Sequence, residues 1–289
     1  MRLLVLIWVV FGATSLFGAA CCSGGSPKSF ISLSRLQNHE IGLSTTFRQV
    51  YSFFNAYGEQ EEAQKNQTTS VTLGVGTRLS QDFQVSAILP FVRQVTGANT
   101  PSREGVGDAT VSAQYTAVES LFSSDWYPTL HLIAGVKLPT GLQATKDGKQ
   151  LLPGTGNGKW EPFVALGMQK NFGPVTLALR SAYTARLLHE NIDSGDAIEL
   201  VESLSYLFSE RLSVALGSAQ TWTWNDKIDG LIRPDTNTRA VSVFVSPTYF
   251  LNRYWSVSTA VDGALPIERI GVNSQAALSF SLTSRYGFY

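Results

Sequence analysis

The chain has 289 residues and a formal net charge of zero, and only 15% of its residues are charged. The lack of a basic excess argues against nucleic acid as a partner, and the charged fraction is low for a soluble β-protein, because globular proteins carry about 25%. After the N-terminal region no segment approaches the ~18 consecutive apolar residues of a membrane helix, so any membrane insertion must use strands.

The first twenty residues have the organisation of a secretory signal peptide. Arg2 supplies the positive start, residues 3–11 form a short apolar run, and the small residues GAA follow at 18–20. The apolar run is too short for a membrane helix. We therefore assign residues 1–20 to a signal peptide and expect an exported protein.

The two cysteines of the chain, Cys21 and Cys22, directly follow this signal. One interpretation is a bacterial lipoprotein site, cleaved before Cys21 and acylated on its sulfur and new N-terminus. The other is ordinary cleavage that leaves incidental thiols, and Gly18 stands where a lipoprotein signal usually has leucine. Because no further cysteine exists, a disulfide framework or a cysteine metal site elsewhere is excluded.

Apolar side chains alternate with small or polar ones along most of the remaining chain. In RLSQDFQVSAILPFV (78–92) they occupy every second position from Phe83 to Phe91. A period of two predicts a β-strand with one face against an apolar phase. The same pattern predicts twelve strands, with apolar faces at 41–53, 71–79, 83–91, 109–117, 130–138, 160–168, 175–187, 198–206, 212–224, 241–249, 255–265 and 276–288.

The connections between these strands alternate in length. Short turns are expected at 80–82, 171–173, 209–211 and 251–253, with 119–128 a longer member of that set. Long polar loops are expected near 55–67, 93–105, 139–158, 189–196 and 225–238. Short periplasmic turns and long outer loops on an even number of strands are typical of outer-membrane barrels. A soluble sandwich has no reason to separate its loops by length.

Aromatic residues also follow this division. One group clusters by the short turns and a second can supply the opposite interfacial girdle of a barrel. The two groups are Phe83, Trp126, Tyr127, Phe172, Phe208, Tyr249, Tyr254 and Trp255, and then Phe53, Phe91, Trp160, Trp222 and Trp224. We therefore predict an all-β fold over residues 40–289, a transmembrane antiparallel up-and-down barrel of about twelve strands whose apolar face meets the lipid bilayer of a Gram-negative-type outer membrane.

The two ends of the predicted barrel carry further signals. Tyr286 and Phe288 in the closing RYGFY resemble the C-terminal aromatic signal by which the barrel-assembly machinery recognises its precursors, although Phe288 is penultimate rather than last. Residues 21–39 are interpreted as a periplasmic N-terminal segment. They either carry a lipid at Cys21, fold into the lumen as a plug, or lie below it.

Three sequence motifs resemble a known family. GVGDATVSAQY (105–115), AGVKLPTG (134–141) and GTGNGKWEPFVALG (154–167) are similar to the putative MetA-pathway phenol-degradation family of outer-membrane proteins, and the likeness covers roughly residues 70–289. The resemblance implies a barrel that passes or binds small organic compounds, hydrophobic ones among them. It implies no reaction, because the family name records an association with a pathway.

The inward face of the strands should carry function, because in a barrel alternate residues point into the lumen. Most inward positions are small, but charges of both signs stand among them: Arg48, Arg78, Asp108, Lys137, Glu161, Arg180, Arg186, Glu199 and Asp262. One interpretation is that they pair across a narrow interior, since a charge facing lipid is costly. The other is a constriction that orients passing solutes.

Catalytic and metal sites are not apparent in the sequence. His131 shares parity with Lys137 and should point inward, which does not suit a hydrolase that acts from the lipid face, and no serine is marked as its partner. The three histidines are too scattered for a zinc site. Asp226, Asp229 and Asp235 lack the ligand spacing of a calcium loop. We expect no enzyme, metal or cofactor.

The leading functional hypothesis is passive or facilitated passage of small organic solutes through the lumen. Three alternatives remain open: a closed barrel with a structural or surface-display role, a membrane-embedded hydrolase, and a soluble β-sandwich lipoprotein. A slip of one residue in any strand would exchange its inward and outward positions.

Overall fold

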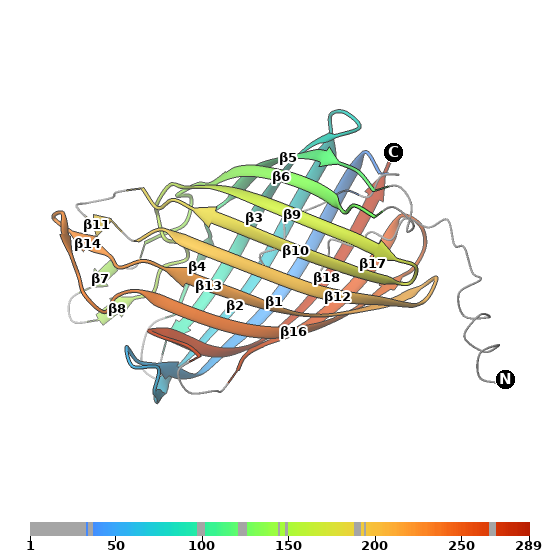
Figure 1. Ribbon diagram of the computed structural model, residues 1–289. Helices are drawn as coiled ribbons and strands as arrows, with labels where there is room; N and C mark the ends of the chain where they lie inside the picture. Colours follow the sequence, from blue (N-terminus) through green and yellow to red (C-terminus); the bar gives the residue numbers. More distant parts are fainter. Residues whose placement is uncertain are drawn as a thin grey trace.

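The chain forms a closed antiparallel β-barrel in this computed structural model (Figure 1). Each long strand is hydrogen-bonded to the long strands before and after it in sequence, and β1 is hydrogen-bonded to β18 to close the barrel. The short strands lie in the connections between long ones. The predicted all-β, up-and-down barrel of about twelve strands is therefore confirmed.

Twelve long strands build the wall. They are β1 (His39–Phe54), β2 (Gln60–Arg78), β3 (Phe83–Thr96), β5 (Thr110–Val118), β6 (Thr129–Lys137), β9 (Glu161–Phe172), β10 (Val175–Thr184), β12 (Ala197–Ser209), β13 (Leu212–Thr223), β16 (Thr238–Phe250), β17 (Trp255–Ala264) and β18 (Ser274–Phe288). The short strands are β4 (Arg103–Val106), β7 (Thr145–Asp147), β8 (Gln150–Leu152), β11 (Ile192–Asp193), β14 (Lys227–Ile228) and β15 (Leu231–Ile232).

The structure describes residues 33, 37–96, 102–120, 126–143, 145–147, 150–187, 192–193, 195–265 and 270–289. The predicted signal peptide and the candidate acylation site Cys21 lie outside these residues, as does most of the segment 21–39. Within the described residues there is no helix long and apolar enough to cross a membrane.

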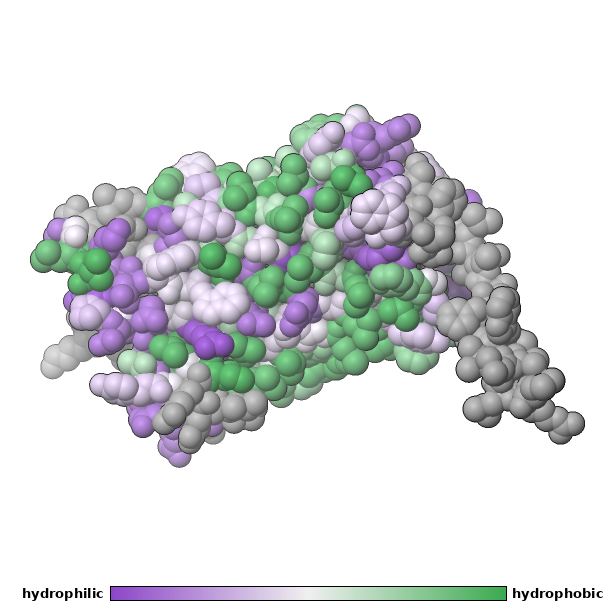
Figure 2. Space-filling model, viewed as in Figure 1, coloured by the Kyte–Doolittle hydropathy of each residue, from purple (hydrophilic) through white to green (hydrophobic). Residues whose placement is uncertain are grey.

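The predicted alternation sets the two faces of the wall. On β2, for example, Leu73 is 46% exposed on the outer surface, whereas its neighbours Gly74 and Gly76 are buried towards the lumen. Residues that pair across neighbouring strands share a face, so the register carries this assignment around the barrel. Hydrophobic side chains cover much of the outer wall between two more polar ends (Figure 2). That surface is the lipid-facing belt of an outer-membrane barrel.

Large aromatic rings on the inner face lie against glycines of neighbouring strands. A Cβ added to Gly135 on β6 would be 2.4 Å from the Phe163 ring, and one added to Gly217 on β13 would be 2.4 Å from the Phe244 ring. Both rings are almost fully buried. The missing side chains therefore let these rings pack along the wall, which is a known way to cover a glycine in a sheet.

The two ends of the barrel differ in the length of their connections. The start of β1 and the end of β18 lie at the end that carries the short turns (Figure 1), which is the periplasmic end in barrels of this class. The turns between β9 and β10 and between β12 and β13 have two residues each, and Gly173 in the first of them has φ +60°. All the connections that contain short strands lie at the opposite, extracellular end.

The predicted loop at 55–67 is wrong in its extent. The connection between β1 and β2 occupies only residues 55–59, because β2 begins at Gln60 and runs for 19 residues. Polar residues at 60–62 continue the ladder with β1 beyond the apolar stretch, across an irregularity between Val50 and Ser52. An apolar pattern marks the part of a strand inside the bilayer, so a polar extension of the hairpin is not visible to it.

Candidate functional site

Two extracellular connections meet at the carboxylate of Asp108, just before β5. This side chain is 9% exposed. Its Oδ1 accepts a hydrogen bond from the Gly141 N–H at 3.0 Å, and its Oδ2 accepts one from the Asn157 N–H at 2.6 Å. A Cβ at Gly156 would lie 2.2 Å from Oδ1, so the close approach requires glycine there. Charge-assisted bonds of this kind are stronger than neutral ones, and they fasten the β3–β5 and β6–β9 connections together.

Two threonine hydroxyls add to this fastening. Thr155 Oγ1 accepts from the Leu142 N–H at 2.9 Å and donates to the Val106 carbonyl at 2.8 Å. In the same way, Thr140 Oγ1 accepts a hydrogen bond from the Ala109 N–H at 2.8 Å and donates one to the Gly107 carbonyl at 2.6 Å. The motifs quoted above as GVGD, KLPTG and GTGNG are thus the parts that hold the loops to one another.

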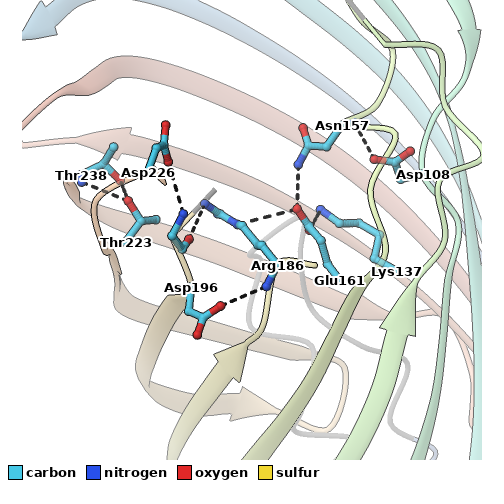
Figure 3. A network of polar contacts seen from close by, with 10 residues as sticks. Asp108, Lys137, Asn157, Glu161, Arg186, Asp196, Thr223, Asp226 and Thr238 are labelled. Carbon is cyan, nitrogen blue, oxygen red and sulfur yellow. Dashed lines mark hydrogen bonds and ion pairs between the residues drawn. The ribbon is translucent and has the colours of Figure 1, made fainter. Parts of the chain in front are cut away.

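A buried carboxylate with two basic partners lies next to this junction (Figure 3). Glu161, the first residue of β9, is 3% exposed. It forms an ion pair with Lys137 at the end of β6, and its Oε1 lies 3.7 Å from Nε of Arg186 and accepts a hydrogen bond from Asn157 Nδ2 at 3.0 Å. The two basic side chains remain 32% and 26% exposed. This trio therefore presents one excess positive charge at the extracellular end of the lumen.

The contacts continue from Arg186 within the β10–β12 connection and then reach the β13–β16 connection. Its backbone N–H donates to Asp196 Oδ1 at 3.1 Å, and its Nη1 donates to the Gly195 carbonyl at 3.2 Å. The Gly195 N–H in turn donates to Asp226 Oδ1 at 3.2 Å. We call this chain of contacts the rim network (Figure 3), and it comprises Asp108, Lys137, Asn157, Glu161, Arg186, Gly195, Asp196 and Asp226.

Deeper in the lumen the inward charges stand opposite one another. Arg180 on β10 interacts electrostatically with Glu199 on β12, and the register puts both at inward positions beside Ala182, which is buried. On the far side, Arg48 and Asp262 both pair in register with Ser279 and interact electrostatically. Both pairs are therefore placed to neutralise each other's charge inside the barrel.

The periplasmic mouth is contacted by the segment that precedes β1. The Leu33 N–H donates to Gln84 Oε1 at 3.1 Å, and Arg78 Nη2 donates to the Leu33 carbonyl at 3.3 Å. Leu33 is 7% exposed, and both of its partners occupy inward positions at the periplasmic ends of β2 and β3. Arg78 also donates to the Gln81 carbonyl at 2.9 Å, which ties this contact to the turn.

A second charged contact lies at the same mouth. Glu40 is 5% exposed, and its Oε1 lies 3.8 Å from Nη1 of Arg285. Gly42 of β1 is paired with Arg285 of β18, where the first and last strands close the barrel. The ion pair therefore links the two ends of the chain across the closing seam.

The nine inward charges predicted from the sequence do not form a single ring. Four of them lie in the rim network, four form the two deeper pairs, and Arg78 holds the segment at the periplasmic mouth. Asp108 and Arg186 lie in connections rather than on strands, and both oxygens of Asp108 are bonded to loop backbone.

Several site residues were missed by sequence reasoning. Glu40 and Arg285 follow the inward parity of their strands, so strict alternation could have found them. Thr140, Thr155 and Asn157 lie in loops without any period. The only signal for these three was the set of motifs that carried the family resemblance.

The lumen also contains His131 of β6. Its Nδ1 lies 3.1 Å from Gln114 Nε2 and 3.2 Å from Thr116 Oγ1, and the register places it inward, beside Gly167. The ring is thus held by polar neighbours of the wall and does not face lipid. In the part of the chain that the structure describes, no group of three or more His, Cys, Asp or Glu residues could hold a metal ion.

The fold and this inner face define an outer-membrane β-barrel. The chain belongs to the family described as "Putative MetA-pathway of phenol degradation", whose model matches residues 54–280. The resemblance predicted from the three motifs is therefore confirmed. No curated protein sequence matches the chain.

Solved structures share the barrel at low sequence identity. The COG4313 outer membrane channel from Pseudomonas putida F1 is similar at a TM-score of 0.75 and 16% identity, over 91% of this chain and 99% of that one. The NanC porin is similar at a TM-score of 0.51 and 9% identity, over 86% of this chain and 100% of that one. The translocator domain of the autotransporter NalP from Neisseria meningitidis is similar at a TM-score of 0.51 and 10% identity, over 87% of this chain and 88% of that one. At these identities the likeness establishes the fold alone. The outer-membrane location follows from the closed barrel itself and its lipid-facing belt.

Proposed function

We propose that the barrel is a narrow channel for small organic solutes and that the Lys137–Glu161–Arg186 trio of the rim network forms its selective mouth. The observation that carries this proposal is the Lys137–Glu161–Arg186 trio, in which a buried carboxylate sits between two partly exposed bases. Charged side chains that line a constriction select solutes by sign. The likeness of the fold to an outer membrane channel and a porin supports passage through the lumen.

The excess positive charge of the trio favours solutes that carry a carboxylate or another acidic group. The rest of the inner wall carries mostly small or polar side chains and the two deeper charge pairs, and the rings of Phe163 and Phe244 pack along it. A short organic acid can place its charge near Lys137 and Arg186 while its apolar part passes these rings. The family name is consistent with small organic solutes but does not identify one.

The loop contacts at Asp108 contribute to this function by position. Because Asn157 is bonded both to Asp108 and to Glu161, the fastened loops and the charged trio are directly connected. A selective constriction needs side chains held in fixed places by a supporting set of contacts. The Asp108 junction therefore supports the mouth, and the trio faces the solute.

The test is conductance of the refolded mature protein in planar lipid bilayers, with Glu161→Gln beside it. Steps of defined size are expected from the wild type, with a reversal potential that indicates anion preference. Glu161→Gln removes the only acid of the trio, so the permeability ratio should move a few-fold further towards anions. Glu210→Gln, at the exposed turn between β12 and β13, is the matched control and should leave the ratio unchanged. Silence from folded protein would overturn the open-channel proposal.

One observation favours a second candidate, a barrel that is closed at its periplasmic mouth. Leu33 is buried there between Arg78 and Gln84. If this contact closes the lumen permanently, the barrel serves a structural or display role. Conductance that stays absent both in the wild type and after removal of residues 21–37 would support that candidate.

A further inference from the structure

One carboxylate of the barrel wall faces outward into the lipid-facing belt. Glu202 lies on β12, where the exposed positions alternate as Glu202, Leu204, Tyr206 and Phe208. Its register partners are Leu179 on β10 and Ser218 on β13. Leu179 is itself an outward side chain, 37% exposed. The register therefore excludes an inward orientation for Glu202.

Its depth in the membrane follows from the aromatic residues on either side. Tyr206 and Phe208 lie on the same strand towards the periplasm, with ring centroids 4.7 Å apart. In the other direction Ile198 pairs with Trp222, next to the extracellular end. Aromatic girdles mark the two interfaces of a barrel. Glu202 is four residues from Ile198 and four from Tyr206, so it lies near the middle of the bilayer.

Glu202 is part of a small polar patch on this outer surface. The Ser218 hydroxyl donates to Glu202 Oε1 at 2.8 Å. Gln220 follows Ser218 on the same face of β13 and pairs with Leu200 on β12. On its other side, Leu200 pairs with the exposed Ser181 on β10. We call Ser181, Glu202, Ser218 and Gln220 the outer polar patch. Hydrophilic atoms interrupt the hydrophobic surface over the front strands (Figure 2).

Lipid is a poor environment for this patch. A charged residue on the lipid face at the bilayer midplane destabilises a barrel by about 2–4 kcal/mol for a base and by less for an acid, and ionisable residues at this depth almost always have polar partners. Ser218 supplies one donor to one carboxylate oxygen. The register also places Gln220 on this outward face, so a polar surface of another protein would satisfy the remaining hydrogen-bonding groups of the patch better than lipid.

A second copy of this chain fits that requirement, because the patch is complementary to itself. Glu202 accepts hydrogen bonds and Gln220 can donate them, and the two lie on adjacent strands, one diagonal position apart, at about 7–8 Å. A two-fold axis between them would bring Glu202 of each copy to Gln220 of the other. The small side chains Ser181 and Ser218 near this axis would let the two walls approach closely.

We propose that the outer polar patch on β10, β12 and β13 is a membrane-embedded contact between two copies of this chain. The interface is isologous, with two reciprocal Glu202–Gln220 contacts near a two-fold axis. Outward apolar residues such as Leu179, Leu204 and Leu216 surround the patch and provide the packed border. This contact is independent of solute passage, so the two proposals can fail separately.

The first experiment places a photo-crosslinking amino acid in the lipid-facing wall of the full-length protein in intact outer membranes. It replaces Leu216, beside the patch, or Leu89 on β3, which lies six strands away around the barrel. Both leucines face outward and are 56% and 46% exposed, so they form a matched pair. A product with the mass of two copies is expected from position 216 and not from position 89. Products of equal yield at both positions, or a conjugate with a different protein, would overturn the proposal.

The second experiment measures the mass of the protein in mild detergent by light scattering. Glu202→Leu removes both reciprocal contacts but suits a lipid-facing wall, so the barrel should still fold. We expect it to weaken self-association by at least about tenfold, which corresponds to about 1.4 kcal/mol. Glu210→Leu, at the periplasmic turn of the same hairpin, should leave self-association as in the wild type. A wild type that is monomeric at every concentration, or unchanged association in Glu202→Leu, would contradict the proposed contact.

Discussion

The two mouths of the barrel are held by different kinds of contact. At the extracellular mouth, side chains such as Asp108 and Thr155 bond to the backbone of other loops, and a buried acid joins two bases. At the periplasmic mouth, the turns are short and close by backbone bonds, such as Ser80 with Phe83. Side-chain contacts there hold the segment before β1 and the closing seam.

This difference indicates which mouth can change without loss of the barrel. The extracellular contacts link four connections in one network, so breaking its centre should loosen several loops together. The periplasmic contact of Leu33 involves one residue of a segment outside the wall, and its loss leaves every strand pairing in place. Changes at the extracellular mouth should therefore mainly lower the stability of the barrel, whereas changes at the periplasmic mouth should mainly alter its conductance.

The largest effect is expected from Asp108→Ala. This change removes two charge-assisted hydrogen bonds, each worth about 1.5–3 kcal/mol, and leaves the Gly141 and Asn157 N–H groups without their acceptor. The free energy of unfolding should fall by about 3 kcal/mol, roughly a hundredfold in the folding equilibrium. Denaturant titration with refolding into detergent micelles would measure it. Asp82→Ala, on an exposed periplasmic turn, is the control, and an equal loss there would contradict the comparison.

A smaller effect at the same mouth is expected from Thr155→Val, which keeps the volume of the side chain. It removes the acceptor of the Leu142 N–H and the donor to the Val106 carbonyl, both neutral hydrogen bonds of about 1 kcal/mol. The expected loss is about 1–2 kcal/mol, roughly five- to thirtyfold in the folding equilibrium, in the same titration. A wild-type midpoint would show that the loops are held by Asp108 alone.

The fold could be predicted because membrane strands carry a strict period of two. Apolar residues such as Leu73 and Leu89 face lipid, and glycines such as Gly74 face the lumen. The alternation along each strand therefore determines the architecture of the whole barrel. The same parity placed Arg180 and Glu199 inward. The rim network could not be assembled in this way, since Asn157 lies in a loop and its contact with Asp108 depends on how two distant connections meet.

The outer polar patch shows a different limit of the pattern. Leu200 and Leu204 belong to the apolar face predicted at 198–206, and Glu202 lies between them on that same face. Strand prediction depends on the majority of outward positions and passes over a single exception. Only the register with Ser218 shows that this exception is bonded on the outer wall rather than turned inward. Exceptions to a strong pattern are therefore the positions where a barrel surface should be searched for partners.

Arg78→Ala sharpens the comparison at the periplasmic mouth. The substitution removes the donor to the Leu33 carbonyl and frees the segment on that side, while the β2–β3 ladder remains. If this contact narrows the lumen, single-channel conductance should rise by about two- to three-fold, since a pore that loses a side-chain obstruction passes more ions. Arg253→Ala, on the turn between β16 and β17, is the control. A conductance equal to the wild type would show that Leu33 does not obstruct the pore.

The smallest effect is expected from Arg180→Ala, in the middle of the lumen. Its removal leaves Glu199 without its opposite charge, so the local field becomes more negative and the permeability ratio should move towards cations. The change should be less than about two-fold, because the more exposed trio at the extracellular mouth remains intact and dominates entry of charged solutes. Reversal potentials in a salt gradient would measure it, beside Glu161→Gln. A shift towards anions, or one larger than that of Glu161→Gln, would locate the selective constriction in the middle of the lumen rather than at its mouth.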